Sequence, residues 1–106
     1  MSIFNPFSRK DINDGVKQYR KEDNAVLLDV RTEEEFSEGH IEGSLNLPSG
    51  EIDRVAALIT DKSTPIYVYC RSGNRSARAA AYLKGNGYTS VYDIGGILSY
   101  KGKIVN

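Results

Sequence analysis

The sequence predicts an α/β fold, with a mainly parallel sheet covered by helices on both faces. Short apolar runs alternate along the chain with segments of helical periodicity, a pattern typical of parallel strands joined by crossover helices. The chain has 106 residues, of which 40% are hydrophobic, which suits one domain with one core. We therefore expect a single domain over residues 1–106, with residues 1–10 as a loosely ordered N-terminal extension.

The strands are expected where apolar residues cluster between turn residues. The runs AVLLDV and IYVY are continuous, as in strands that are buried on both faces. Leu45 and Leu47 indicate a short strand that Pro48 closes. The expected strands are residues 25–30, 45–47, 66–69 and 91–94.

The helices are expected in the segments between these strands. The first begins near Ile12, with Asn13 or Asp14 as its cap. Thr32 followed by Glu35 has the spacing of a capping box, which marks the start of a short helix. Further segments of helical spacing are residues 52–59 and 76–84.

Cys70 is the only cysteine, so the chain can form neither an internal disulfide nor a self-contained dithiol redox pair. It directly follows the predicted strand 66–69 and precedes the predicted helix 76–84. Ligands of parallel sheets bind beyond the carboxyl ends of the strands. Although a single cysteine is often a small buried apolar residue, this position makes Cys70 a candidate nucleophile.

The residues after Cys70 favour an anionic sulfur. A loop that leads from a strand end into a helix start directs backbone N–H groups at one point, and Gly73 supplies the freedom for the curl. Nearby guanidinium groups, including that of Arg78, add positive charge, although Arg78 fits a solvated surface role equally well. A thiol there should ionise more readily than a free cysteine, and the thiolate is the nucleophilic form. The expected binding loop comprises Arg71, Ser72, Gly73, Asn74 and Arg75.

Three motifs in this order resemble the rhodanese family. The segment CRSGNR resembles the family's active-site loop, C-x-x-G-x-R. The similarity runs from about Ile12 to the C-terminus. Residues that resemble the first family signature are Asp29-Val30-Arg31, Glu35, Phe36, Gly39-His40-Ile41, Gly43-Ser44, Asn46 and Pro48, and those that resemble the closing turn are Asp93 and Gly95-Gly96-Ile97.

The resemblance implies a central, mainly parallel sheet of five strands and a sulfurtransferase of the thiosulfate:cyanide type. Such an enzyme moves sulfane sulfur from a donor such as thiosulfate to a thiophilic acceptor through a persulfide, here on Cys70. No metal or organic cofactor is implied. Asp29, Arg31 and His40 are expected to support the site, and Arg75 either faces the substrate or braces the loop by pairing with a carboxylate, for which the candidates are Asp29 and Glu35. We favour bracing.

Two positions depart from the common family pattern. Tyr100 stands where many relatives carry Trp, which keeps an aromatic side chain for packing. Ser72 stands where relatives that act on thiosulfate often have a second basic residue, so the identity of the donor is left open.

Three other functions are alternatives to sulfur transfer. Cysteine phosphatases of this architecture use C-x-x-x-x-x-R, whereas four residues separate Cys70 from Arg75 here, and the shorter loop suits a sulfur atom better than a phosphoryl group. A thiol-dependent reductase, for instance of arsenate, is a related alternative. A non-catalytic rhodanese-like regulatory or protein-binding module is the third alternative, but inactive modules typically lose the loop cysteine.

Lys plus Arg and Asp plus Glu both number 14, so the formal net charge is zero. This balance argues against nucleic acid or an anionic membrane as partner. The first ten residues lack the apolar run of a signal peptide, and with a free thiol they favour a cytoplasmic location. The expected partners are a small-molecule sulfur donor and a thiol or protein acceptor, with a monomer as the working hypothesis.

Overall fold

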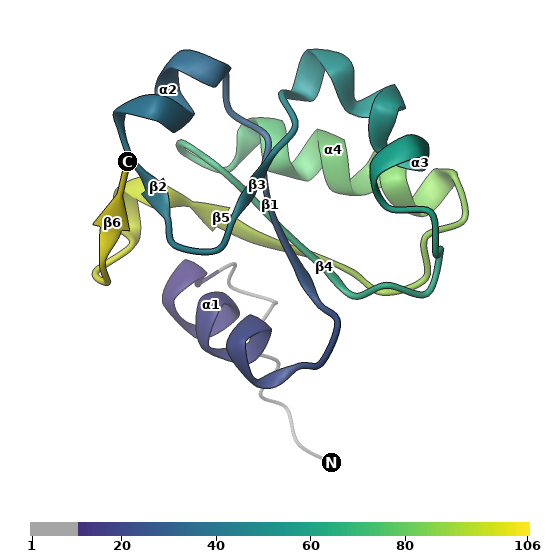
Figure 1. Cartoon of the computed structure of the whole chain (residues 1–106), viewed down its shortest axis with the longest axis horizontal. Helices are drawn as coiled ribbons and strands as arrows, with labels where there is room; N and C mark the ends of the chain where they lie inside the picture. The colour runs from purple at the N-terminus through teal and green to yellow at the C-terminus, as the bar shows by residue number, and fades with distance from the viewer. Residues whose placement is uncertain (1–10) are drawn as a thin grey trace.

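The structure, a computed structural model, describes residues 11–106 and places a parallel sheet between two helical layers (Figure 1). Within this range the main sheet has four strands in the order β3-β1-β4-β5. A separate antiparallel pair, β2 and β6, lies at one end. The strands are β1 (Val26–Asp29), β2 (His40–Ile41), β3 (Leu45–Asn46), β4 (Ile66–Cys70), β5 (Val91–Gly96) and β6 (Ile104–Val105).

The α/β class and the parallel sheet flanked by helices are confirmed. Over residues 11–106 the main sheet has four strands rather than the five that the family resemblance implied. His40–Ile41, where no strand was expected, pairs with Ile104–Val105 as a separate sheet, in which His40 lies opposite Val105. The expectation of a loosely ordered extension at residues 1–10 lies outside the described residues.

Helices cover both faces of the main sheet. Figure 1 shows α1 on one side, and α2, α3 and α4 on the other. The helices are α1 (Ile12–Lys21), α2 (Glu33–Glu38), α3 (Val55–Leu58) and α4 (Asn74–Gly85), and the 3₁₀ turns are η1 (Ser49–Arg54) and η2 (Ile97–Ser99). None of the helices in the described part of the chain is long and apolar enough to cross a bilayer.

Alternate residues of each strand supply two separate cores. Leu28 of β1 and Val68 of β4 belong to the buried cluster that includes Leu83 of α4. Their neighbours Leu27 and Tyr67 belong to the cluster under α1. This alternation follows from the two-residue period of a strand, and it explains why the central strands read as continuous apolar runs.

Several element boundaries differ from the sequence-based expectation. The cap of α1 is Asp11, whose carboxylate accepts the Asn13 N–H at 2.9 Å, rather than Asn13 or Asp14. The expected helix at 52–59 is a 3₁₀ turn followed by the four-residue α3. The last expected helix begins earlier, at Asn74, because the left-handed Gly73 marks its start.

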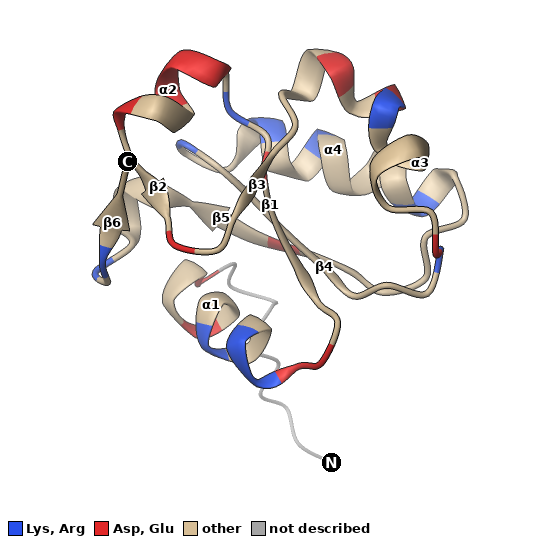
Figure 2. Ribbon diagram, in the orientation of Figure 1, with Lys and Arg blue, Asp and Glu red and all other residues tan. Residues whose placement is uncertain are grey.

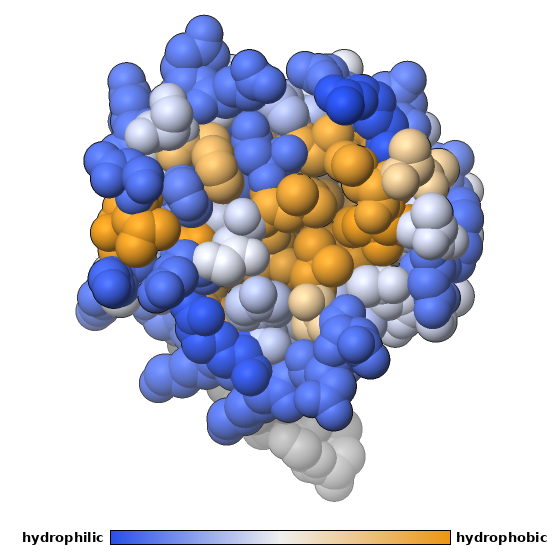
Figure 3. Space-filling model, in the orientation of Figure 1, coloured by the Kyte–Doolittle hydropathy of each residue, from blue (hydrophilic) through white to orange (hydrophobic). Residues whose placement is uncertain are grey.

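The edge of the sheet at β3 carries apolar surface. Figure 3 shows an apolar area in the middle of the face on which β1, β3 and α3 lie. Leu45 of β3 and Leu58 of α3 are both exposed. Apolar side chains are therefore exposed on both β3 and α3.

Gly15 tests how closely α1 approaches the sheet. A Cβ at Gly15 would lie 2.4 Å from Ile94 Cγ2, so Gly15→Ala should destabilise the protein by about 1–3 kcal/mol in urea unfolding. Gly85 is a matched control in α4, since a Cβ there meets nothing within 4 Å. Gly85→Ala should be neutral or stabilising by up to about 1 kcal/mol. Equal effects of the two substitutions would contradict the packing at α1.

Candidate active site

Cys70 is the last residue of β4 and is 1% exposed. The chain then turns through a short loop and enters α4 at Asn74. Gly73, with φ at 110°, makes the turn in a conformation that favours glycine. The fold therefore places the thiol at the carboxyl end of a central strand, directly before a helix start.

The sulfur of Cys70 has one backbone donor and one hydroxyl neighbour among the described residues. The Gly73 N–H donates to Sγ at 3.0 Å, and Ser76 Oγ lies 3.5 Å from Sγ. Cys70 also belongs to the buried apolar cluster that includes Val30 and Ala79. The thiol is thus buried, as is common for a single cysteine. It also accepts a hydrogen bond from a loop amide, as expected for a reactive cysteine.

A hollow of about 390 Å³ lies against the loop. Gly96 of β5 lines the hollow and lies close to the loop backbone, since a Cβ there would be 2.4 Å from the Arg71 carbonyl oxygen. That oxygen accepts the Leu98 N–H at 3.2 Å, which joins the loop to η2. The hollow is lined by Arg71, Ser72, Gly73, Asn74, Gly95, Gly96, Leu98 and Ser99.

Arg75 pairs with Glu35 rather than with Asp29. Its two terminal nitrogens lie 2.7 and 3.1 Å from the two carboxylate oxygens, which is a bidentate pair between α4 and α2. The capping box at Thr32 holds the same carboxylate, through the Thr32 N–H at 3.0 Å. The hydrogen bonds from Arg75 lower the pKa of Glu35 to about 2, and the same bonds raise the pKa of Arg75.

The three arginines near Cys70 therefore play unequal parts. Arg75 is neutralised by Glu35, and Arg78 lines a different hollow beside Tyr82. Arg71 is exposed and is the one guanidinium on the hollow at the loop, within the residues that the structure describes. Figure 2 shows acidic α2 near the basic start of α4, so the field at the thiol is less positive than the sequence suggested.

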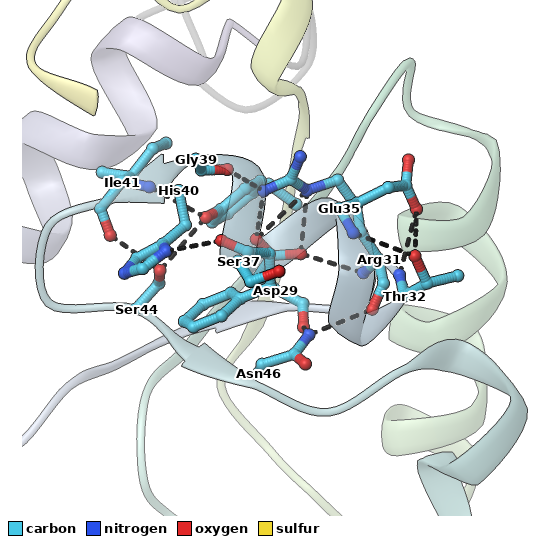
Figure 4. Close-up of polar contacts among 12 residues, drawn as sticks. Asp29, Arg31, Thr32, Glu35, Ser37, Gly39, His40, Ile41, Ser44 and Asn46 are labelled. Atoms are coloured by element: carbon cyan, nitrogen blue, oxygen red, sulfur yellow. Dashed lines mark hydrogen bonds and ion pairs between the residues drawn. The ribbon is translucent and has the colours of Figure 1, made fainter. Parts of the chain in front are cut away.

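Asp29, the last residue of β1, and Arg31 form a buried polar network (Figure 4). Arg31 Nη2 lies 2.8 Å from Asp29 Oδ2 and donates to the Gly39 carbonyl oxygen at 2.6 Å. Burial disfavours the charged guanidinium, but the bonds to Asp29 outweigh it and raise the pKa of Arg31. The Asn46 amide donates to the carbonyl oxygens of both residues, at 3.0 Å each. The network fixes the segment between β1 and β2.

Tyr69 ties β4 to β2 and to the turn after it, from the face of the sheet opposite to Cys70. Its hydroxyl accepts the Ile41 N–H at 3.2 Å and donates to Ser44 Oγ at 3.1 Å. Burial raises the pKa of Tyr69, so this hydroxyl keeps its proton and its donor role. The residue before Cys70 is thereby held in place.

His40 is the first residue of β2, and its side chain packs on α2. Its ring stacks on Phe36 with a centroid distance of 3.7 Å, and Nδ1 donates to the Phe36 carbonyl oxygen at 2.8 Å. These contacts join β2 to α2. Among residues 11–106, no group of three His, Cys, Asp or Glu side chains is placed to hold a metal ion.

Ser76 and the carboxylate of Asp93 lie at the site, although neither is among the site residues predicted from the sequence. Ser76 Oγ lies 2.8 Å from Asp93 Oδ1, directly beside the Cys70 sulfur. The spacing of α4 places Ser76 on its buried stripe, which was a usable signal. The approach of Asp93 depends on strand pairing, which the sequence alone does not give.

The family model for the rhodanese-like domain matches residues 13–103. The chain belongs to the rhodanese-like domain family. Among curated relatives, the uncharacterized protein YqhL of Bacillus subtilis (strain 168) is 44% identical over 81% of this chain and 66% of its own length, just under two thirds. Thiosulfate sulfurtransferase PspE of Escherichia coli (strain K12) is 37% identical over 66% of this chain and 68% of its own length.

Solved structures with the same fold support the assignment to this family. A rhodanese from E. coli, solved with anions, has a TM-score of 0.71 and 33% identity, and the match covers 76% of this chain and 96% of that one. The Alr3790 protein from Anabaena sp. has a TM-score of 0.76 and 27% identity, over 88% of this chain and 79% of that one.

The Arg75–Glu35 pair makes an acid-dependent contribution to the stability of this rhodanese domain. The pKa of Glu35 is about 2 in the folded protein against an ordinary value of 4.5, so the contribution is complete above pH 4.5 and is lost as pH falls toward 2. Glu35→Gln should lower the free energy of unfolding by roughly 1–2 kcal/mol at neutral pH, and by progressively less below pH 4.5.

Urea unfolding across this pH range measures the difference, with Glu34→Gln as the matched control on an exposed position of the same helix. If the free energy of unfolding of Glu35→Gln equals that of wild type from neutral pH into the acid range, the pair does not stabilise the fold.

Proposed function

We propose that this protein is a sulfurtransferase of the thiosulfate:cyanide type, which carries sulfane sulfur as a persulfide on Cys70. The observation that carries the proposal is the hydrogen bond from the Gly73 N–H to the Cys70 sulfur, at 3.0 Å. It puts a donor on the sulfur where an anion would form. The relatives named thiosulfate sulfurtransferase support the same reaction class.

The reaction is a double displacement. The Cys70 thiolate attacks the outer sulfur of thiosulfate, the sulfur–sulfur bond of the donor breaks, and sulfite leaves with the bonding electron pair. The enzyme then holds a persulfide. An acceptor nucleophile attacks the outer sulfur, and the Cys70 thiolate leaves. Because the two substrates react in separate steps, the kinetics should be ping-pong.

The loop residues have separate tasks in this mechanism. Arg71 lines the hollow and attracts the anionic donor. The N–H of Gly73, with the first amides of α4 at Asn74 and Arg75, stabilises the persulfide anion, since the first amides of a helix lack partners within it. Ser72 contributes only its backbone to the loop. The site therefore has one loop cation, Arg71, for the donor, which suits a small anion.

The remaining residues keep the loop in shape. Arg75 braces it through Glu35, while Asp29 and Arg31 fix the neighbouring segment and His40 organises the turn into β2. We propose cyanide as the acceptor in the test tube, and a protein or small-molecule thiol as the acceptor in a cytoplasmic setting. A monomer suffices, because every residue named here comes from one chain.

Cys70 should be the carrier of the transferred sulfur. Treatment with thiosulfate is expected to add one sulfur atom to the protein, and addition of cyanide should remove it and release thiocyanate. Intact-mass measurement checks both steps. Cys70→Ser should gain no sulfur. Sulfur loading by Cys70→Ser, or no loading of wild type together with hydrolysis of an aryl phosphate or reduction of arsenate, would refute the proposal.

Arg71 and Arg78 form a matched pair of exposed arginines that differ in position. Arg71→Ala should raise the KM for thiosulfate about threefold to tenfold, because it removes the cation on the hollow, and the effect should shrink at high salt. Arg78→Ala should leave KM unchanged. Steady-state kinetics with both variants measures this, and equal effects would remove Arg71 from the donor site.

A further inference from the structure

Two polar side chains lie in the apolar interface between α4 and β5. Ser76 is 0% exposed and shares the buried stripe of α4 with Ala79 and Leu83. Asp93 is in register with Val68 of β4, and the two-residue period puts it on the strand face that α4 covers. Polar groups in such an interface are unfavourable unless they are hydrogen-bonded. The presence of these two residues therefore suggests a role other than packing.

Ser76 and Asp93 meet beside the reacting sulfur. Ser76 Oγ lies 3.5 Å from Cys70 Sγ, 2.8 Å from Asp93 Oδ1 and 3.0 Å from the Gly73 carbonyl oxygen. The hydroxyl has a single hydrogen, so it can donate fully to only one of these acceptors at a time.

The charge on the sulfur decides which acceptor wins. When Cys70 carries a proton, its S–H donates to Ser76 Oγ, and the hydroxyl donates to the Asp93 carboxylate. When the sulfur is an anion, it has no hydrogen to offer, and the lone pairs of Ser76 Oγ face it unfavourably. Rotation of the hydroxyl then gives a charge-assisted bond to sulfur, while Asp93 Oδ1 keeps the Gly95 N–H at 3.1 Å.

We propose that Ser76 is a catalytic residue whose hydroxyl turns from Asp93 to the Cys70 sulfur when that sulfur becomes anionic. Asp93 is a positioning residue that competes for the same hydrogen. The inference rests on the proposed function, since it assigns the hydroxyl to the thiolate and persulfide states. It supplies a side-chain donor beside the Gly73 amide.

Other charged groups around the sulfur stay constant in this process. Arg75 of α4 is paired with Glu35 of α2, and Arg71 is in the loop. Asp29 and Arg31 form their own pair at the end of β1. Substitution of Ser76 and Asp93 therefore leaves these charged groups in place.

The test is the rate at which iodoacetamide alkylates Cys70, followed from mildly acidic to mildly alkaline pH. Ser76→Ala should slow alkylation at neutral pH about tenfold, because the anion loses a donor. Ser76→Thr keeps a hydroxyl and should restore most of the rate. An unchanged rate in Ser76→Ala would overturn the catalytic assignment.

Asp93→Asn should accelerate alkylation several-fold, because the weaker acceptor releases the hydrogen to sulfur. Loss of a nearby negative charge acts in the same direction, so the double variant separates the two effects. The acceleration should be larger when residue 76 is Ser than in the Ser76→Ala protein. Equal acceleration in both backgrounds would show that charge alone acts, and would overturn the competition.

Controls keep these outcomes distinct. Asp23→Asn removes an exposed carboxylate at the opposite end of β1 and should leave the rate unchanged. If Ser76→Ala fails to fold, Ser76→Gly removes the same hydroxyl and replaces it in the single and double variants, with the same expected outcomes. An unchanged or slower rate in Asp93→Asn overturns the proposal in either case. Alkylation needs no sulfur donor, so it reports on Ser76 even where intact-mass measurement shows no persulfide and the proposed function fails.

Discussion

The hydrogen bond from the Gly73 N–H to the Cys70 sulfur joins the end of β4 to the start of α4, and the rest of the site is arranged around it. It requires a left-handed residue at position 73, which glycine supplies without strain. It also requires β5 to pass close beneath the loop, which only a residue without a Cβ allows at Gly96. Two glycines thus shape the surroundings of one sulfur atom.

Ion pairs hold the neighbouring segments without adding net charge at the sulfur. Arg75 is matched by Glu35, and Arg31 is matched by Asp29. The first pair joins α4 to α2, and the second fixes the segment that follows β1. With these charges balanced, hydrogen-bond donors close to the sulfur matter more than distant cations, and the side chains that compete for those donors become important. This is why the Ser76–Asp93 contact is of interest in a buried site.

The features that depend on local spacing could be predicted from the sequence. The strand that ends at Cys70, the capping box of Thr32 and Glu35, and the two helical layers all follow from periodicity or short motifs. The features that depend on long-range pairing could not. The β2–β6 pair joins segments of two residues each, too short for a periodic signal, and Asp93 reaches Ser76 only through the β4–β5 register. The net positive charge that the arginines place near Cys70 also could not be predicted, because the structure was needed to show that Glu35 neutralises Arg75.

The most direct test of the account is a crystal structure of the protein after treatment with thiosulfate. The expected result is an outer sulfur bonded to Cys70, within hydrogen-bond distance of the Gly73 N–H and of the first amides of α4. An outer sulfur packed among apolar side chains such as Val30 and Ala79, with no amide directed at it, would contradict the central claim that backbone donors at a strand end hold the sulfur anion.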